Sequence, residues 1–181
     1  DYQADQSGTA LVTVTATSNG QTADDVFSVT VAAVDDAPVV ANALSDLTIL
    51  EDAVDSTIDL SNVFNDVDDA NSSITKTAVS SATGLVTVAV SGDTLTLDYQ
   101  ADQNGTATIT VTADSDSLTV DDVFMVTVTA ANDPPLVANP ILDVSVNEDA
   151  PNDTIDLTNV FNDTDDANAS ITKTATSSDN S

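Results

Sequence analysis

The sequence has no cysteine, histidine, arginine or tryptophan, and its only basic side chains are Lys76 and Lys173. Without cysteine there is no disulfide and no thiolate nucleophile or ligand, so hydrophobic packing or a bound metal must stabilise the fold. Without histidine, arginine or a glycine-rich phosphate loop, the usual groups for acid–base catalysis and phosphoryl transfer are missing. Phenylalanine and tyrosine total six, too few to favour a sugar-cleaving cleft built on paired carboxylates. We therefore expect no enzyme activity.

Charge of one sign dominates the composition. There are 31 acidic residues against two basic ones, which gives a formal net charge of −29 at pH 7. Nucleic acids and anionic membranes would repel such a chain, so neither is expected as a partner. The apolar runs are only a few residues long, so no direct membrane insertion is expected. The charge instead favours cations as partners, or a saline setting that screens self-repulsion.

The chain repeats itself with an offset of 97 residues, the difference between positions 98 and 1. Residues 1–10 match residues 98–107, and residues 22–40 match residues 119–137, without any insertion. A period of this length is typical of independent domains rather than of solenoid turns. The predicted organisation is the C-terminal part of one repeat (1–37), a complete repeat (38–133) and the N-terminal part of a third (134–181). We expect a segment of a longer array.

Apolar and polar residues alternate through most of the repeat, and threonine and valine are abundant, as in half-buried strands. Strands are predicted at residues 47–49, 57–60, 74–79, 86–90, 95–99, 107–113 and 124–130. Asp121 and Asp122 are expected in a turn before the last of these. About seven strands and no helix predict an all-β protein of tandem antiparallel Greek-key β-sandwiches.

An acidic loop occurs twice, at residues 64–76 and 161–173, each time before an alternating run. Its carboxylates are Asp66, Asp68, Asp69 and, in the second copy, Asp163, Asp165, Asp166. Hard cations such as Ca²⁺ take six to eight oxygen ligands, which such a loop supplies. An EF-hand is excluded, because its glycine and glutamate positions, counted from Asp66, hold Asn71 and Thr77. The alternative is that these acids form only a solvated, salt-tolerant surface.

The order of these landmarks resembles a cadherin repeat, and is closer still to the cadherin-like repeats of large bacterial surface adhesins. Residues 147–149 (Asn-Glu-Asp) resemble the acidic motif of the first strand, and residues 97–100 (Leu-Asp-Tyr-Gln) resemble Leu-Asp-Arg-Glu. Residues 113–115 resemble the family's x-Asp-x loop, and residues 35–38 and 132–135 its acidic linker. The resemblance covers the whole chain and implies Ca²⁺ bound between neighbouring repeats.

Carried over residue by residue, the resemblance implies a ligand set at each junction. The first would use Asp1, Asp35, Asp36, Asp66, Asp68, Asp69 and Asp114. The second would use Glu51, Asp98, Asn132, Asp133, Asp163, Asp165 and Asp166. The chain departs from the family where Gln100 replaces a ligand glutamate and where Asn19-Gly20 stands in place of Asp116-Ser117, and its linkers contain fewer acids. Fewer than three ions per junction are therefore expected.

Lys76 is the only cation of the complete repeat and, by alternation, shares a face with Ile74 and Ala78. A charge on an apolar face needs a partner. Either it reaches a carboxylate at the sheet edge, or it forms a Lys–Asn isopeptide cross-link of the kind found in some pilin-like sandwiches.

The expected function is that of a structural or adhesive extender, a calcium-stiffened array in a secreted or cell-surface bacterial adhesin or biofilm protein. Its partners would be the neighbouring repeats of the same chain. One alternative is a self-assembling extracellular filament of identical chains, each completed by strand addition from a neighbour. Another is a carbohydrate-binding module, which the scarcity of aromatic residues disfavours.

Overall fold

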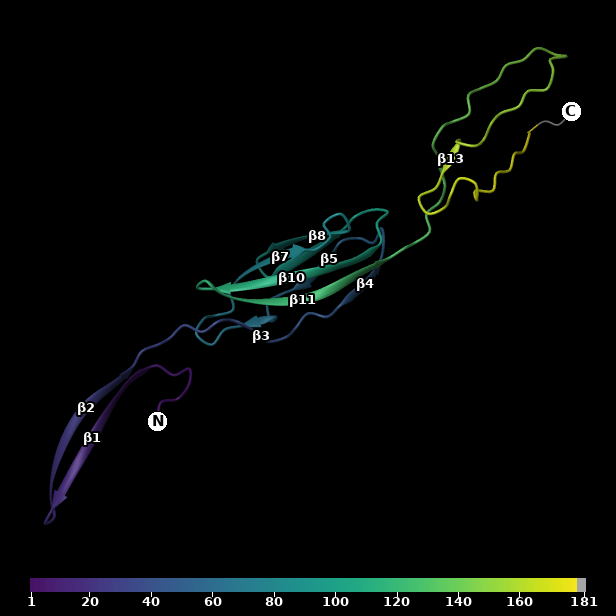
Figure 1. Ribbon diagram of the computed structural model, residues 1–181. Coiled ribbons are helices and arrows are strands. Elements are labelled where there is room, and N and C mark those ends of the chain that lie inside the picture. The colour runs from purple at the N-terminus through teal and green to yellow at the C-terminus, as the bar shows by residue number, and fades with distance from the viewer. Residues whose placement is uncertain (179–181) are drawn as a thin grey trace.

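The computed structural model describes residues 1–178, and its three parts follow one another along an elongated molecule (Figure 1). The last residues of the predicted third repeat, 179–181, lie outside the described residues. Every regular element within residues 1–178 is a β-strand, so the predicted all-β class is confirmed. No helix in this described range is long and apolar enough to cross a membrane.

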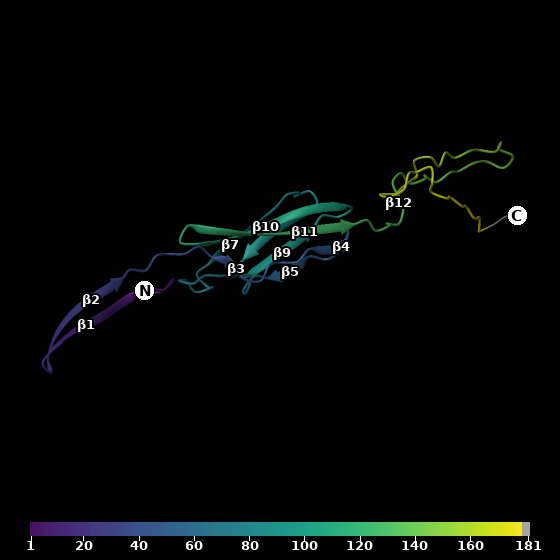
Figure 2. The same ribbon diagram turned by 60° about the horizontal axis from the view of Figure 1, so that its bottom comes forward.

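The middle part is a two-sheet sandwich (Figures 1 and 2). Its strands are β3 (Val39–Val40), β4 (Leu47–Leu50), β5 (Ser56–Asp59), β6 (Phe64–Asn65), β7 (Thr75–Ser80), β8 (Val86–Ser91), β9 (Thr94–Tyr99), β10 (Gly105–Ser115) and β11 (Leu118–Thr129). One sheet has the order β4-β11-β10-β7 and the other β5-β9-β8, with β3 and β6 as a separate pair. Seven of these strands were predicted, and the two-residue strands β3 and β6 were not.

The core forms where the inward faces of the two sheets meet. In β10 every second side chain is buried, as in Ile109 and Val111, and the same holds for Phe124 and Val126 of β11. The other sheet contributes a fully buried row that includes Leu97. Burying a side chain of this kind stabilises the fold by about 1.5–3 kcal/mol. The middle part therefore has a closed core of its own.

Two details differ from the prediction of an antiparallel sandwich with a turn at Asp121 and Asp122. The pair formed by β4 and β11 is parallel, because both strands run toward the second junction. The tight turn lies earlier, at Asp116 and Ser117, whose φ angles of 48° and 75° suit a two-residue hairpin. Asp121 and Asp122 therefore lie inside β11 rather than in a turn.

A buried carboxylate inside a strand is tolerated only if the fold supplies donors. Asp122 is buried, and its Oδ2 accepts a hydrogen bond from the backbone N–H of Leu44 at 2.7 Å. Asp46 accepts from the N–H of Met125 at 2.7 Å, just before β4 begins. These two carboxylates therefore hold the segment that leads into β4 against β11.

Lys76 is buried in β7, as the alternation predicted. Its Nζ lies 2.7 Å from Oδ1 of Asp93, whose side chain is half exposed in the turn between β8 and β9. The same Nζ donates to the backbone carbonyls of Ile74 and Asn71 at 3.4 and 3.5 Å. The structure therefore places Lys76 beside an edge carboxylate, the first of the two predicted arrangements.

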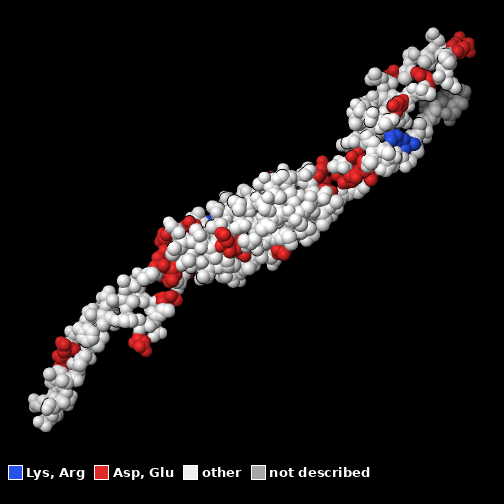
Figure 3. All heavy atoms as spheres, viewed as in Figure 1, with Lys and Arg blue, Asp and Glu red and all other residues white. Residues whose placement is uncertain are grey.

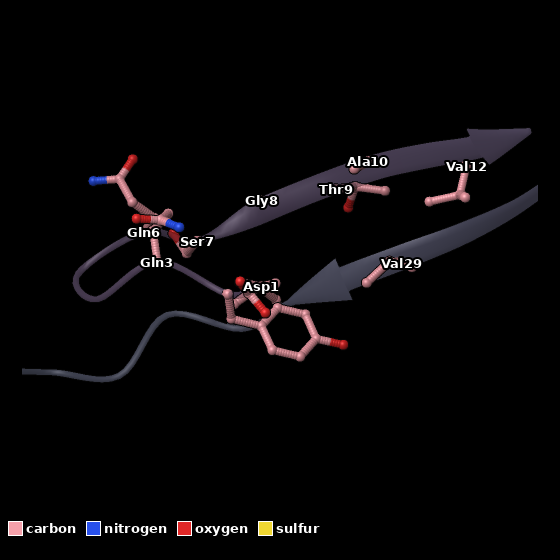
Figure 4. Close-up of a pocket in the computed structure, with 11 residues that line it drawn as sticks. Asp1, Gln3, Gln6, Ser7, Gly8, Thr9, Ala10, Val12 and Val29 are labelled. Carbon is pink, nitrogen blue, oxygen red and sulfur yellow. The ribbon is translucent and has the colours of Figure 1, made fainter.

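The first part contains one hairpin, β1 (Gly8–Ser18) with β2 (Gln21–Val31), in the register of β10 with β11. Its inward positions are nevertheless open: Val14 and Phe27 are 55% and 48% exposed, against 0% and 2% for their counterparts Val111 and Phe124. Figure 4 shows this face, with Val12 and Val29 beside the segment that starts at Asp1.

The third part contains one small pair, β12 (Leu136–Val137) with β13 (Phe161–Asn162), which reproduces β3 with β6 at the offset of 97. The counterparts of β4, β5 and β7, at 144–147, 153–156 and 172–177, form no strands within the described residues. In the middle part those strands pair with β11, β9 and β10. The same sequence pattern therefore becomes a strand only where its partner is present.

Candidate metal centre at the repeat junctions

The acidic loop that follows β6 folds by bonding to its own backbone. Oδ1 of Asp66 accepts hydrogen bonds from the N–H groups of Asp68 and Asp69 at 2.9 and 3.2 Å. Asp163 makes the same pair of bonds, at 3.0 Å each, with Asp165 and Asp166. Aspartate often closes a turn in this way, so the loop conformation follows from the local sequence.

The linker before each loop is tied to it by one further bond. The N–H of Asp36 donates to Oδ2 of Asp68 at 2.9 Å, and the N–H of Asp133 donates to Oδ2 of Asp165 at 2.6 Å. Because the two bonds are related by the offset of 97, both junctions bring a linker and the next acidic loop together in the same way. Linker and loop residues thus lie together at both junctions.

Asp66 is the least accessible carboxylate of the loop. Its side chain is 7% exposed, and while Oδ1 is used by the turn, Oδ2 is buried and has no hydrogen-bond partner. A buried carboxylate oxygen without a donor is costly, and such atoms in folded proteins usually bind water or an ion. Oδ2 of Asp66 is thus a buried acceptor that is open to a water molecule or a cation.

Three carboxylates beside Asp66 form what we call the first carboxylate group: Asp35, Asp69 and Asp116, each with an oxygen within 4.8 Å of the others. Asp69 is held by Ser115, whose hydroxyl donates to its Oδ2 at 2.8 Å. Desolvation raises the pKa of Asp35, and the neighbouring negative charges raise it further. Those charges belong to Asp116, Asp69, Asp66 and Asp68. Five carboxylates therefore act on one another at this end of the sandwich.

The opposite end of the sandwich holds the second carboxylate group: Asp52, Asp102 and Asp133, again within 4.8 Å of one another. Oδ1 of Asp52 accepts from the N–H of Asp102 at 3.1 Å, which joins two loops, and Oδ2 of Asp133 is buried without a partner. Desolvation and then the charges of Asp52, Asp102, Asp165 and Glu51 raise the pKa of Asp133. Repulsion between carboxylates is therefore also concentrated at this end of the sandwich, where the chain continues from β11 into the linker.

Glu51 lies next to this second group, but both of its carboxylate oxygens accept hydrogen bonds from the protein. It is buried; its Oε1 accepts from the N–H of Ala131 at 2.7 Å, and its Oε2 from the side-chain amide of Asn104 at 3.5 Å. Both oxygens therefore already have protein donors. Glu51 fixes the direction in which the chain leaves β11, which places Asp133 against Asp52.

Several predicted ligands lie outside the two groups. Asp98 accepts from the hydroxyl of Thr87 at 3.1 Å on the outer side of β9, and Asp114 accepts from the N–H of Ser117 at 3.1 Å in the hairpin turn. Asn132 donates its side-chain amide to the carbonyl of Asp133 at 3.0 Å. Asp36 contributes its backbone N–H to the junction.

Sequence reasoning missed three members of the groups: Asp52, Asp102 and Asp116. All three have positive φ angles, of 59°, 55° and 48°. Aspartate and asparagine are enriched in this conformation, so turn positions held by aspartate were the available signal. Figure 3 shows the result, with acidic side chains gathered at the two ends of the middle sandwich.

Comparisons with known proteins add little. No family model matches the chain, and no curated protein matches it. Among solved structures, an endo-fucoidan hydrolase from glycoside hydrolase family 107 is 17% identical, with a TM-score of 0.39 over 77% of this chain and 22% of that chain. The titin domains Z1Z2 in complex with telethonin are 14% identical, with a TM-score of 0.40 over 69% of this chain and 62% of that chain. The aligned part thus spans about a fifth of the hydrolase, and these low scores carry no functional argument.

Proposed function

We propose that the chain is a segment of a tandem cadherin-like array in which Ca²⁺ bound at the repeat junctions turns a flexible string of sandwiches into a stiff rod. The parent would be a secreted or cell-surface protein, and this segment a non-catalytic extender that serves adhesion or biofilm cohesion. The observation that carries the proposal is the buried, unpartnered Oδ2 of Asp66 beside the first carboxylate group.

The donor set fits a hard cation. At the first junction the ligands would come from Asp66 and from the first carboxylate group, and at the second from the second carboxylate group together with Asp165. All are oxygen donors on loops, which suits the variable geometry and higher coordination number of Ca²⁺ better than the strict octahedron of Mg²⁺. Extracellular Ca²⁺ modules work at dissociation constants of about 10⁻⁴–10⁻³ M, so a site of this exposure suits an extracellular protein.

The physical effect would be a change in the sign of the interaction between repeats. Without a cation, each linker brings carboxylates of two repeats together, and desolvation strengthens their repulsion. At the first junction a bound divalent ion would replace this repulsion with bonds from the linker and from the sandwich after it. At the second junction the bonds would come from the sandwich before the linker, from the linker and from the loop after it. The linkers carry Pro38, Pro134 and Pro135, which already restrict the backbone there.

The proposal is tested by measuring thermal unfolding and calorimetric binding of the chain in CaCl₂, in MgCl₂, and in NaCl of matched ionic strength with a chelator. We expect Ca²⁺ to raise the melting temperature far more than the other salts, and scattering to show a narrower range of molecular lengths. The variant Asp66→Asn should lose most of this response. Asp24→Asn, which makes the same charge change inside β2, should retain it. Equal responses in NaCl and CaCl₂ would show that the carboxylates are only a solvated surface.

A second candidate is a filament completed by strand addition between copies. The inward face of β1 and β2 is exposed, and so are apolar residues of the third part such as Leu142 and Val146. Both exposed surfaces favour this candidate. Of the 16 residues in the middle core, 12 have counterparts at the offset of 97: Tyr2, Ala10, Val12, Val14, Ala16, Phe27, Val29 and Val31 in the first part, and Leu157, Val160, Phe161 and Ile171 in the third.

In such a filament the first part of one copy would pack on the third part of the next. Electron microscopy of the chain at rising concentration tests the candidate. Filaments that disappear in the variant Phe27→Asp, but persist in Asp24→Asn, would support it. Single particles at every concentration would contradict it.

A further inference from the structure

The second linker contains the only aspartate–proline bond of the chain, between Asp133 and Pro134. Proline makes this peptide bond a tertiary amide whose nitrogen has no N–H. Such a nitrogen takes up a proton more readily than an ordinary peptide nitrogen, so it leaves its carbonyl carbon more easily. Because it has no N–H, it also cannot attack the aspartate side chain. The reaction open to this bond is therefore attack on the backbone carbonyl by the carboxylate of Asp133.

The carboxylate of Asp133 has an oxygen available for such an attack. Its Oδ2 is buried and has no hydrogen-bond partner among the described residues. Hydrogen-bond donors and solvent weaken a carboxylate as a nucleophile, because they stabilise its negative charge. The oxygen and the carbonyl carbon belong to the same residue, so the attack is intramolecular and needs no encounter between two molecules. Asp133 therefore carries its own nucleophile.

The carbonyl that would be attacked already accepts a hydrogen bond from a side chain. Asn132 donates its side-chain amide to the carbonyl oxygen of Asp133 at 3.0 Å. A donor in this place stabilises the negative charge that develops on the oxygen during attack, as in an oxyanion hole. The N–H of Asp133 is held as well, because it donates to Oδ2 of Asp165 at 2.6 Å. The junction thus polarises the carbonyl of Asp133 and restrains its backbone.

The first linker lacks two parts of this arrangement. At the offset of 97, Asp36 matches Asp133, but it is followed by Ala37 and preceded by Asp35. An ionised carboxylate only accepts hydrogen bonds, so Asp35 cannot donate to the carbonyl as Asn132 does. The bond from the linker N–H to the next acidic loop is nevertheless present at both junctions. The two linkers therefore fold alike and differ in the groups that this reaction uses.

We propose that the Asp133–Pro134 bond is a self-cleavage site, at which the carboxylate of Asp133 attacks its own carbonyl carbon. Oδ2 forms a bond to this carbon, the bond from the carbon to the Pro134 nitrogen breaks, and the nitrogen takes a proton from solvent. Asp133 is left as a cyclic anhydride, which water opens to two carboxylates. One water molecule is consumed overall: its oxygen enters a carboxylate of Asp133, and its two protons equal those on the freed nitrogen. The reaction is a single event on the chain's own backbone.

Cleavage would separate the third part from the middle part. In Figure 1 the chain passes between them through this linker as one extended segment. In the proposed function a cation at the second junction would hold the carboxylate of Asp133, and a ligated carboxylate is not free to attack. An array would therefore be cut at this junction when it loses its cations. Only the protection by a cation rests on the proposed function, and the cleavage itself does not.

The test is intact-mass measurement of the full chain during incubation with a chelator in mildly acidic buffer, which supplies the proton for the departing nitrogen. We expect fragments 1–133 and 134–181 to accumulate, with no cut after Asp36. Pro134→Ala should abolish the cut. Asn132→Ala should slow it about tenfold or more, because it removes the donor to the carbonyl. An unchanged rate in Asn132→Ala would overturn the proposal.

Two further measurements separate this reaction from ordinary hydrolysis. The folded chain should be cut faster than the same chain in urea, where the arrangement around Asp133 is lost. In isotopically labelled water, part of the label should enter the side-chain carboxylate of Asp133, because water can open either side of the anhydride. Equal rates with and without urea, or label confined to the new C-terminal carboxylate, would overturn the proposal.

The first junction supplies a matched control. Asp35→Asn/Ala37→Pro gives it both missing groups and should create a cut after Asp36, whereas Ala37→Pro alone should be cut much more slowly. Incubation of the parent chain in CaCl₂ should slow the cut after Asp133. Equal cleavage in CaCl₂ and in chelator would support the self-cleavage site and contradict a cation on Asp133. A bond that is stable in both would overturn the self-cleavage site.

Discussion

The hairpin β1–β2 and the hairpin β10–β11 have closely similar sequences, equal register and the same kind of two-residue turn, but opposite burial. Phe124 lies in a closed core, whereas its counterpart Phe27 is half exposed. Asn19 and Gly20 form the first turn with φ angles of 52° and 80°, and Asp116 and Ser117 form the second with 48° and 75°. Local sequence thus determines the strands and the turn in both places.

Burial of each hairpin depends on the strands that surround it. β10 and β11 lie between β7 and β4 and face the sheet of β5, β9 and β8, while β1 and β2 pair only with each other in the described residues. A two-stranded hairpin alone is marginally stable in water. The local sequence of a repeat is therefore enough to form the strands and the turn, whereas burial of the hairpin requires the neighbouring strands and the opposite sheet.

The largest expected difference between the two hairpins is in the free energy of unfolding that is lost when the phenylalanine ring is removed. Phe124→Ala should destabilise the middle part by about 3–5 kcal/mol, because it empties a packed site. Phe27→Ala should change the same unfolding transition by less than about 0.5 kcal/mol. Urea unfolding of the full chain measures both. Similar costs would mean that β1–β2 is buried against another molecule in solution.

The two junctions can be compared by removing one carboxylate from each. At 100 times its dissociation constant, Ca²⁺ should stabilise the middle part by about 2.7 kcal/mol. Asp66→Asn should remove much of this gain and, with a chelator, should leave stability equal or higher, because it removes a buried unpaired charge. Asp165→Asn should lower the Ca²⁺ stoichiometry and remove part of the Ca²⁺-dependent gain, because Asp52 and Asp102 of the middle part would share the second ion. Loss of stability in both conditions would argue that Asp66 has only a structural role.

The two lysines offer a smaller contrast. Asp93→Asn should destabilise the middle part by about 1–3 kcal/mol, because Lys76 stays buried without its ion-pair partner. Lys173 bonds to the carbonyls of Asn168 and Ile171, as Lys76 does with its own loop, but no salt bridge is seen for it in the described residues. Lys173→Met should therefore leave the unfolding curve of the middle part unchanged. Intact mass distinguishes the ion pair from a cross-link, which would lower the mass by one ammonia.

The smallest expected effect is a pH dependence. The N–H of Ser61, with help from its hydroxyl, lowers the pKa of Asp59 below its ordinary value of 3.8. This carboxylate therefore stabilises the fold above pH 3.8 and loses that contribution as the pH falls through its lowered pKa. Asp59→Asn should lower the melting temperature slightly at pH 6, with the difference vanishing in strong acid. The equivalent Asp156→Asn should have no such effect on the middle part, although Thr158 lowers the pKa of Asp156 too.

Much of the candidate site was predictable, because the loop from Asp66 to Asp69 folds through bonds to its own backbone. The members contributed by distant turns were not. Asp52, Asp102 and Asp116 reach the junctions because strand pairing brings three separate turns to the sandwich ends. Conversely, Asp98 was predicted as a ligand, but its carboxylate is bonded to Thr87 on the outer face.

The sequence alone determined the repeat of 97 residues, the alternation of the strands, the hairpin turns and the acidic loops, because each depends on neighbours only a few residues apart. Tertiary structure decided which of these patterns became buried strands. The segment 144–147 has the pattern of β4 but remains unpaired, because only the middle part provides it with a partner such as β11. Tertiary structure also decided which carboxylates converge, because repulsive side chains meet only where a packed core holds their loops together.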